Sequence, residues 1–168
     1  GLLWPDFPES NARHTLSQAL TGLRRLLGDR ERTSPYLETT RATIELTDGG
    51  QTWVDVREFD ALLHRRTDDL EGVAHAVTLY QGDFLSGFSL GDAPGFEEWQ
   101  LLQRERLRRR VAEALALLVE RHTAEGTYEI ALPFAWRLVE LDPWQETAQR
   151  HLIRLLALTG QRGAALRQ

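Results

Sequence analysis

Leucines recur in the first part of the chain at the spacing of one face of an α-helix. They lie four, three and four positions apart, at Leu16, Leu20, Leu23 and Leu27. Apolar residues at such intervals form a single stripe along a helix. Ser10 precedes the stripe as a suitable N-cap, and Gly28 follows it as a C-terminal stop. The pattern therefore predicts an amphipathic helix over residues 10–27.

A different pattern follows this helix. Residues 36–39 and 43–46 are short runs rich in Thr and Ile, and Thr40, Arg41 and Ala42 separate them. After an Asp-Gly-Gly turn at 48–50, residues 52–56 form a third run of this kind. Short runs of this composition, bounded by turn residues, are typical of β-strands. We therefore predict a small antiparallel hairpin, joined by a third strand at 52–56.

The remaining residues show helical spacing. Asp55 and Glu58 have capping-box spacing and predict a helix that continues through residue 63, and further helices are predicted near 70–80, 96–125, 128–140, 143–159 and from 162 onward. Asp142 is expected to cap the helix that begins at Pro143, and Gln145 to complete a capping box. The nearly continuous charge of residues 104–110 is expected to face solvent. Three tryptophans are expected to pack between helices, namely Trp99, Trp136 and Trp144.

The C-terminal third contains an echo of itself at a distance of 34 positions. Gly126 recurs as Gly160, Leu118 as Leu152, and the pair at 131–132 as that at 165–166. This is the period of the tetratricopeptide repeat, a helix-turn-helix unit that buries its apolar face by stacking on neighbours. Such repeats form binding surfaces, so this part of the chain is expected to contact a partner.

Composition excludes several classes of function. There is no cysteine among the 168 residues, which excludes a disulfide framework and thiolate metal sites. The five histidines (His14, His64, His75, His122 and His151) lack the spacing of metal ligands. No apolar run is long enough to span a membrane, and neither a phosphate-binding loop nor a nucleophile elbow is present. We expect no enzyme, no cofactor, no metal site and no membrane partner.

The net charge of −5 excludes a chain that coats nucleic acid along its whole length. Residues 10–33, however, carry five arginines against two carboxylates. A recognition helix needs an apolar face for anchoring and a polar, Arg-bearing face that enters the major groove. Arginine can bind guanine and glutamine can bind adenine through paired hydrogen bonds. Helix 10–27 has both faces, although an ordinary solvated helix would show the same pattern.

The order of helix and hairpin is that of a winged helix, and here a resemblance to a known family appears. Residues 3–6, 11–28 and 36–56 resemble the winged-helix half of SARP-type regulators, which are relatives of the OmpR-type DNA-binding domain. The later segments resemble the bacterial transcriptional activator domain of those regulators, at 79–88, 96–110, 126–132, 140–146 and 159–166. The resemblance covers essentially the whole chain.

This resemblance implies a mainly α-helical fold with two domains. Residues 1–56 would be a partial winged-helix DNA-binding domain, and residues 57–168 a bacterial transcriptional activator domain with tetratricopeptide-like repeats. The family's winged helix begins with a small sheet and two helices. In this chain only residues 2–4 could represent the end of the second of these helices. We therefore expect the chain to be part of a longer protein.

The family consists of cytoplasmic bacterial transcription activators that bind double-stranded DNA and contact RNA polymerase. On this chain the DNA-binding candidates are, on the recognition helix, Arg13, His14, Ser17, Gln18, Thr21, Arg24 and Arg25, and, near the tip of the wing, Thr40 and Arg41. The helical domain would mediate dimerisation or contact with polymerase or another protein partner. The alternative is a protein-interaction scaffold in which the winged-helix remnant is only structural.

Overall fold

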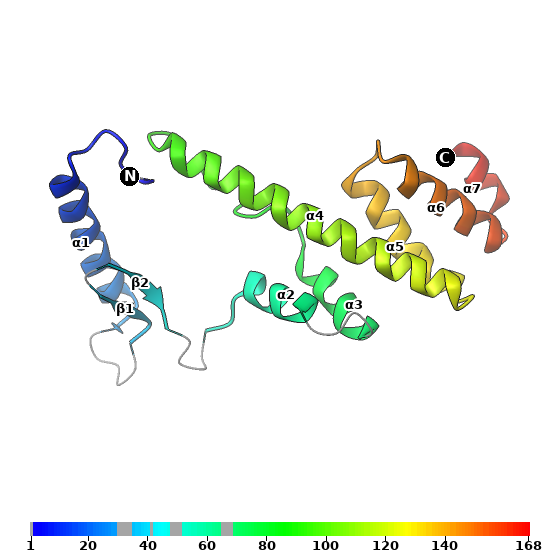
Figure 1. Ribbon diagram of the computed structural model, residues 1–168, viewed down its shortest axis with the longest axis horizontal. Coiled ribbons are helices and arrows are strands. Elements are labelled where there is room, and N and C mark those ends of the chain that lie inside the picture. Colours follow the sequence, from blue (N-terminus) through cyan, green and yellow to red (C-terminus); the bar gives the residue numbers. More distant parts are fainter. Residues whose placement is uncertain (1, 30–34, 41, 48–51, 65–68) are drawn as a thin grey trace. The chain divides into compact units, whose positions relative to one another are not determined.

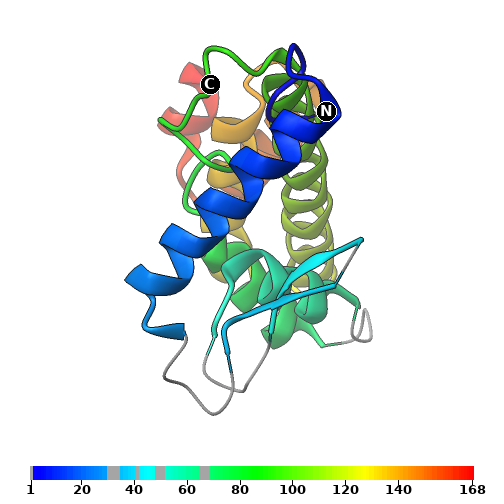
Figure 2. The ribbon, with the colours of Figure 1, turned by 90° about the vertical axis from the view of Figure 1, so that its left-hand side faces the viewer.

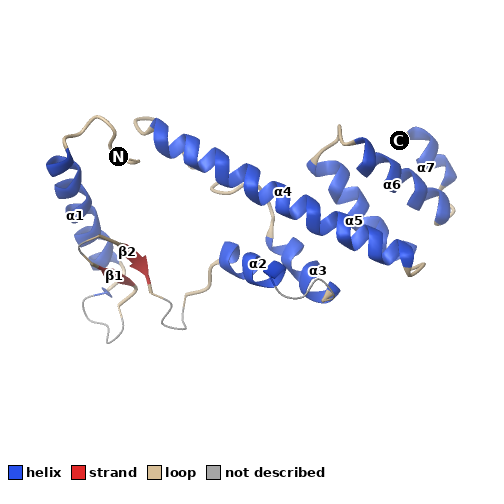
Figure 3. Ribbon diagram, in the orientation of Figure 1, coloured by secondary structure: helices blue, strands red, loops and turns tan. Residues whose placement is uncertain are grey.

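A computed structural model describes residues 2–29, 35–40, 42–47, 52–64 and 69–168. Within these ranges it contains seven helices and one two-stranded hairpin, which confirms a mainly α-helical fold with a small β-hairpin (Figure 3). The chain divides into two compact units, one made of residues 1–54 and 87–99 and the other of residues 55–86 and 100–168. No helix in the described part has the length and apolar character that crossing a bilayer requires.

The first unit is built around helix α1 (Glu9–Leu26). The helix begins before Ser10, so the predicted N-cap is wrong. The reason is that the carbonyl of Pro8 already accepts hydrogen bonds from the amides of Asn11 and Ala12, at 2.9 and 3.0 Å. The predicted stop is confirmed, because Gly28 adopts a φ of +64° that favours glycine.

Strands β1 (Leu37–Thr39) and β2 (Ile44–Leu46) form the predicted antiparallel hairpin beside α1 (Figures 1 and 2). Leu37 pairs with Leu46 and Thr39 with Ile44, so that these side chains share one face. The predicted third strand is absent: residues 52–54 have no regular structure and residue 55 already begins the next helix. Asp55 favours this early start, since its carboxylate accepts a hydrogen bond from the amide of Val56 at 2.8 Å.

The second unit contains α2 (Asp55–His64), α3 (Leu70–Leu79), most of α4 (Pro94–Ala124), α5 (Tyr128–Leu141), α6 (Glu146–Leu158) and α7 (Arg162–Arg167). Helix α2 packs on α3, α5 on α6, and α6 on α7 (Figure 1). The largest fully buried side chains of its core are leucines at 115, 118, 152, 155 and 156. Burial of a leucine side chain contributes about 1.5–3 kcal/mol to stability, so these five leucines hold α4 and α6 in the core.

The 34-residue echo appears in the backbone of the second unit. Gly126 and Gly160 have φ values of +76° and +79°. The residue after each glycine donates its amide hydrogen to the carbonyl five positions earlier, at 2.9 Å for Thr127 and 2.8 Å for Gln161. The two turns therefore end their helices with the same hydrogen-bond pattern, that of a glycine-terminated helix. Leu118 and Leu152, the equivalent core positions, are both fully buried.

Three expectations about the helices are wrong. Helix α6 begins at Glu146 and not at Pro143, because the carboxylate of Asp142 accepts a hydrogen bond from the amide of Trp144 at 3.1 Å. Asp142 thus closes a local turn, a role that competes with helix capping. Residues 104–110 do not all face solvent, since Leu107 is buried. Trp144 is not packed between helices, since 94% of its surface is accessible, whereas Trp99 and Trp136 keep only 36% and 39% of theirs.

Arginines of the charged segment of α4 tie its neighbours together. Both Arg106 and Arg110 contact the carboxylate of Asp60 on α2. The guanidinium of Arg104 donates to the carbonyls of Phe84 and Leu85, at 2.8 and 3.0 Å. These acceptors lie 19 to 50 positions away in sequence, so the spacing within α4 gave no indication of them.

Candidate nucleic-acid interface

Helix α1 exposes a polar face opposite its leucines. His14, Gln18, Thr21 and Arg25 follow one another at four, three and four positions, which places them on one side of the helix. All four are exposed. The residues on the leucine side of the helix are also not fully buried, and 42% of the surface of Leu23 is accessible. The helix therefore presents a polar, exposed face and a partly covered apolar face.

Several groups on the polar face contact each other. The side-chain nitrogen of Gln18 lies 2.9 Å from Nε2 of His14. The hydroxyl of Thr21 donates to the carbonyl of Ser17 at 2.9 Å. In contrast, the guanidinium of Arg25 has no hydrogen bond or ion pair with any described residue. Arg25 is therefore the cation of this face that is most available to a ligand.

Arg13 lies nearer the side of the helix and is already paired. Its Nε and Nη2 donate to the carboxylate of Glu9 at 3.0 and 2.6 Å, and both side chains are more than 70% exposed. An exposed pair of this kind is worth about 0.2–1 kcal/mol. Its guanidinium can therefore exchange Glu9 for a stronger acceptor at little cost.

Arg24 has a different environment from its neighbour Arg25. Its Nη2 donates to the carbonyl of Leu37 at 3.2 Å and to the hydroxyl of Thr39 at 2.9 Å. Both acceptors belong to β1, and Arg24 is partly buried against them. In this structure Arg24 holds the hairpin to the helix.

Asp29 is a second anchor of the hairpin, and the sequence analysis missed it. Its carboxylate accepts hydrogen bonds from the amides of Tyr36 and Leu37, the latter at 3.2 Å. Only 4% of its surface is accessible. Buried carboxylates are uncommon unless paired. Its place directly after the helix-ending Gly28 was the only sequence signal that this residue shapes the connection.

The tip of the hairpin is a tight turn organised by Thr40. The amide of Thr40 donates to the carbonyl of Thr43 at 2.9 Å. Its hydroxyl oxygen accepts from the amides of Ala42 and Thr43, at 3.1 and 3.0 Å. Thr40 thus shapes the turn, whereas Arg41, the other predicted tip residue, lies outside the described residues.

One face of the hairpin is acidic. Glu38 and Glu45 are directly opposite each other in the register of β1 and β2, and both are exposed. Two like charges in this position destabilise a strand pair. They would also repel phosphate groups. Any contact between the hairpin and a nucleic acid must therefore involve its tip and not this face.

The described residues offer little else in the way of chemistry. None of their histidines and carboxylates gather into a group that could hold a metal ion. Of the five arginines counted in the basic segment, Arg30 and Arg32 lie outside the described residues, as does Glu31. The available polar groups are therefore those of the outward face of α1 and the hairpin tip.

A comparison of the sequence with protein families identifies the second unit. The sequence model of the bacterial transcriptional activator domain matches residues 54–168. The chain belongs to this family. The match includes every helix from α2 to α7. This family is a regulatory family of the transcription-activator type and not an enzyme family, which indicates a function of that type for the domain. No curated protein and no solved structure matches the chain.

Proposed function

We propose that the protein is a DNA-binding transcription activator whose α1 and hairpin act as the helix and wing of a partial winged helix. The observation that carries the proposal is the double anchoring of β1 to the end of α1 by Arg24 and Asp29. It holds the hairpin beside a helix whose opposite side is polar and exposed. The resemblance of residues 11–28 and 36–56 to SARP-type regulators supports the same interpretation.

In this proposal the outward face of α1 enters the major groove. Arg25 binds a guanine edge or a phosphate with its unpaired guanidinium, and Gln18 binds adenine. His14, Ser17, Thr21 and Arg13 contact neighbouring bases or phosphates. The hairpin tip at Thr40 and Arg41 approaches the backbone. Arg24 positions the tip and does not read bases.

In this proposal the domain of residues 54–168 supplies the protein contacts through which DNA binding leads to activation of transcription. Such a domain of stacked helices forms an extended surface. We assign this surface to a protein partner, either RNA polymerase or a second copy of the chain. Because bacterial transcription takes place in the cytoplasm, the protein is expected to act there.

The proposal is tested by selecting binding sites from random DNA duplexes with the 168-residue protein, followed by titrations of the enriched duplex at several salt concentrations. Replacing Arg25 by alanine should weaken binding about tenfold or more and reduce the slope of log K against log salt by about 1. Arg162→Ala removes an exposed charge from α7 and is the matched control, with no expected change. An Arg25→Ala protein with unchanged affinity and salt slope would exclude α1 as the recognition helix.

A second candidate is a scaffold that binds only proteins. It is favoured by the acidic pair Glu38 and Glu45 on the hairpin and by the net charge of −5. The two candidates differ in their response to salt. DNA binding weakens steeply because counterions are released, whereas a complex with a peptide responds modestly. Failure to enrich any duplex, together with salt-insensitive binding to polymerase subunits, would establish the scaffold.

A further inference from the structure

The C-terminal helices are basic, although the chain as a whole is acidic. Residues 147–168, which contain most of α6 and all of α7, include four arginines and no aspartate or glutamate. Two of these arginines, Arg150 and Arg154, lie about one turn apart on α6, and both are exposed. Ile153 lies between them and keeps 37% of its surface. We call these three residues the α6 face, and the proposed DNA interface on α1 does not use it.

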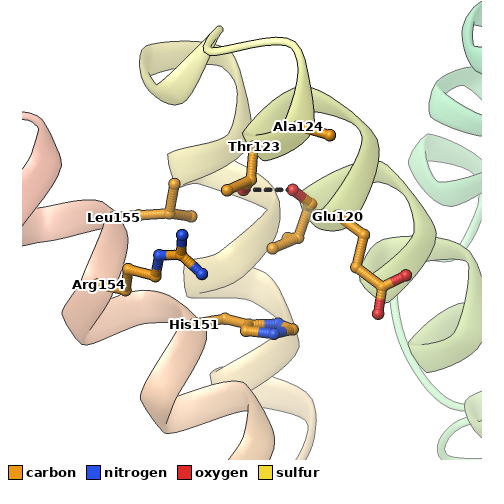
Figure 4. Close-up of a pocket in the computed structure, with 7 residues that line it drawn as sticks. Glu120, Thr123, Ala124, His151, Arg154 and Leu155 are labelled. Atoms are coloured by element: carbon orange, nitrogen blue, oxygen red, sulfur yellow. Dashed lines mark hydrogen bonds between the residues drawn. The ribbon is translucent and has the colours of Figure 1, made fainter.

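Neither arginine of the α6 face has a strong partner within its own chain. Arg150 contacts Glu146 at 3.8 Å, and the two side chains are 73% and 85% exposed, so this pair contributes only about 0.2–1 kcal/mol. Arg154 has no hydrogen bond or ion pair with any described residue. At the pocket between α4 and α6, Figure 4 shows the carboxylate of Glu120 directed away from Arg154. The α6 face therefore offers two guanidinium groups to an acidic partner.

The hairpin carries the complementary pair of charges. Glu38 and Glu45 lie directly opposite each other on its exposed face. Neither carboxylate has a hydrogen bond or ion pair with a described residue. The Cβ atoms of residues opposite each other in a strand pair are about 4.5–5.5 Å apart, and those of residues four positions apart on a helix about 5–6 Å. The glutamate pair of the hairpin thus has nearly the same spacing as the arginine pair of the α6 face.

We propose that the α6 face binds the acidic face of the hairpin of a second copy of this chain. Each glutamate then contacts one arginine, which relieves the repulsion between Glu38 and Glu45. A DNA backbone would also supply negative charge, but Ile153 between the arginines favours a protein surface, since phosphate groups offer it no apolar contact.

The contact joins two different surfaces, so each copy can supply its hairpin to one neighbour and its α6 face to another. The inference deepens the proposed function and rests on it in one respect, the assignment of the domain at residues 54–168 to a protein partner. It names a second copy as that partner and gives the residues on both sides of the contact.

Sedimentation velocity of the 168-residue protein without DNA, at concentrations up to about 1 mM, measures this association. The mass should rise with concentration above that of one chain. High salt should oppose the rise, because the contact is between exposed charges.

Two charge-reversed variants test the two surfaces. Glu38→Arg/Glu45→Arg changes the hairpin, and Arg150→Glu/Arg154→Glu changes the α6 face. Each variant alone should associate about 100-fold more weakly, at about tenfold for each reversed pair. An equimolar mixture of the two variants should associate again, because the reversed hairpin of one fits the reversed α6 face of the other. Recovery in the mixture also shows that both variants are folded.

Two matched controls reverse exposed charges elsewhere. Arg109→Glu changes α4 and Glu71→Arg changes α3, and neither should alter the association. The proposal is overturned if the protein stays monomeric at every concentration, or if the mixture associates no better than either variant alone. Loss of DNA affinity in Arg150→Glu/Arg154→Glu with unchanged self-association would assign the α6 face to DNA and would overturn it as well. Failure of the DNA-binding proposal would instead appear in the Arg25→Ala titration, since self-association is measured without DNA.

Discussion

Replacing Asp29 by alanine tests whether this buried carboxylate fixes the hairpin. Asp29 accepts hydrogen bonds from two backbone amides at the start of β1. A hydrogen bond to a charged group contributes about 1.5–3 kcal/mol, so the loss of both would amount to roughly 3–6 kcal/mol if no water replaced them. The amides can be hydrated once the hairpin separates from α1. We therefore expect local opening of the hairpin to become about 2–4 kcal/mol easier.

Amide hydrogen exchange provides the assay. The useful probes are the amides of Thr40 and Thr47, which donate to Thr43 and Tyr36 within the hairpin and not to Asp29. An opening free energy lower by about 2–4 kcal/mol corresponds to exchange faster by roughly 30- to 1,000-fold. Exchange at these amides reports on the hairpin as a whole, whereas the amides bonded to Asp29 would exchange faster for a trivial reason.

Two further substitutions make the result interpretable. Asp29→Asn keeps one acceptor oxygen and should give an intermediate acceleration. Glu38→Ala removes a carboxylate from the exposed face of β1 and should not accelerate exchange. If Asp29→Ala leaves the exchange of Thr40 and Thr47 within twofold of the original protein, the hairpin is held by other contacts and the reasoning is refuted.

Three further predictions concern the hairpin, the core and one tyrosine. Glu45→Gln removes the repulsion with Glu38, and should stabilise the hairpin by about 0.2–1 kcal/mol in thermal unfolding and raise DNA affinity. Leu152→Ala should cost about 2–5 kcal/mol in denaturant unfolding because the side chain is fully buried, whereas Leu166→Ala, 88% exposed, should change stability by less than about 0.5 kcal/mol. Equal effects would contradict the assigned core. Burial, and then the hydrogen bond to Asp83, raise the pKa of Tyr80 from 10.0 to about 12. The folded state thus favours the neutral phenol, so its contribution to stability is complete below pH 10 and is lost as the pH rises through 12. Ultraviolet absorbance should show one phenolate that forms only as the pH approaches 12, and this transition should be missing in Tyr80→Phe. Titration of Tyr80 near pH 10 would contradict this assignment.

Much of the fold could be predicted because its signals are local. The helix over residues 10–27 ends at Gly28, where the backbone needs a positive φ, and the hairpin forms where β-branched residues flank a turn. The turns at Gly126 and Gly160 were visible as a repeat. The errors arose where two local roles compete. Asp142 has the side chain of a good N-cap, but it closes a turn with Trp144.

The contacts that organise the candidate interface were not predictable, because they join residues far apart in sequence. Arg24 was expected to face DNA, and the structure adds hydrogen bonds to acceptors on β1 that lie 13 and 15 positions away. Asp29 lies within the basic segment, where the sequence indicated only that its carboxylate lowers the net positive charge of that segment. Nothing in the spacing of either residue indicates burial. The polar face of α1, in contrast, follows directly from helical periodicity.

The matching turns at Gly126 and Gly160 make the second unit modular. The two turns have similar φ values, +76° and +79°, and the same pattern of amide-to-carbonyl bonds, so a segment of 34 residues starts and ends with closely similar turns. Such a segment can be duplicated without breaking any hydrogen bond of the turns, because the inserted copy brings both halves of the junction. Insertion of one whole 34-residue segment should therefore be tolerated better than an insertion of another length within the helices, which would shift the buried leucines relative to the turns.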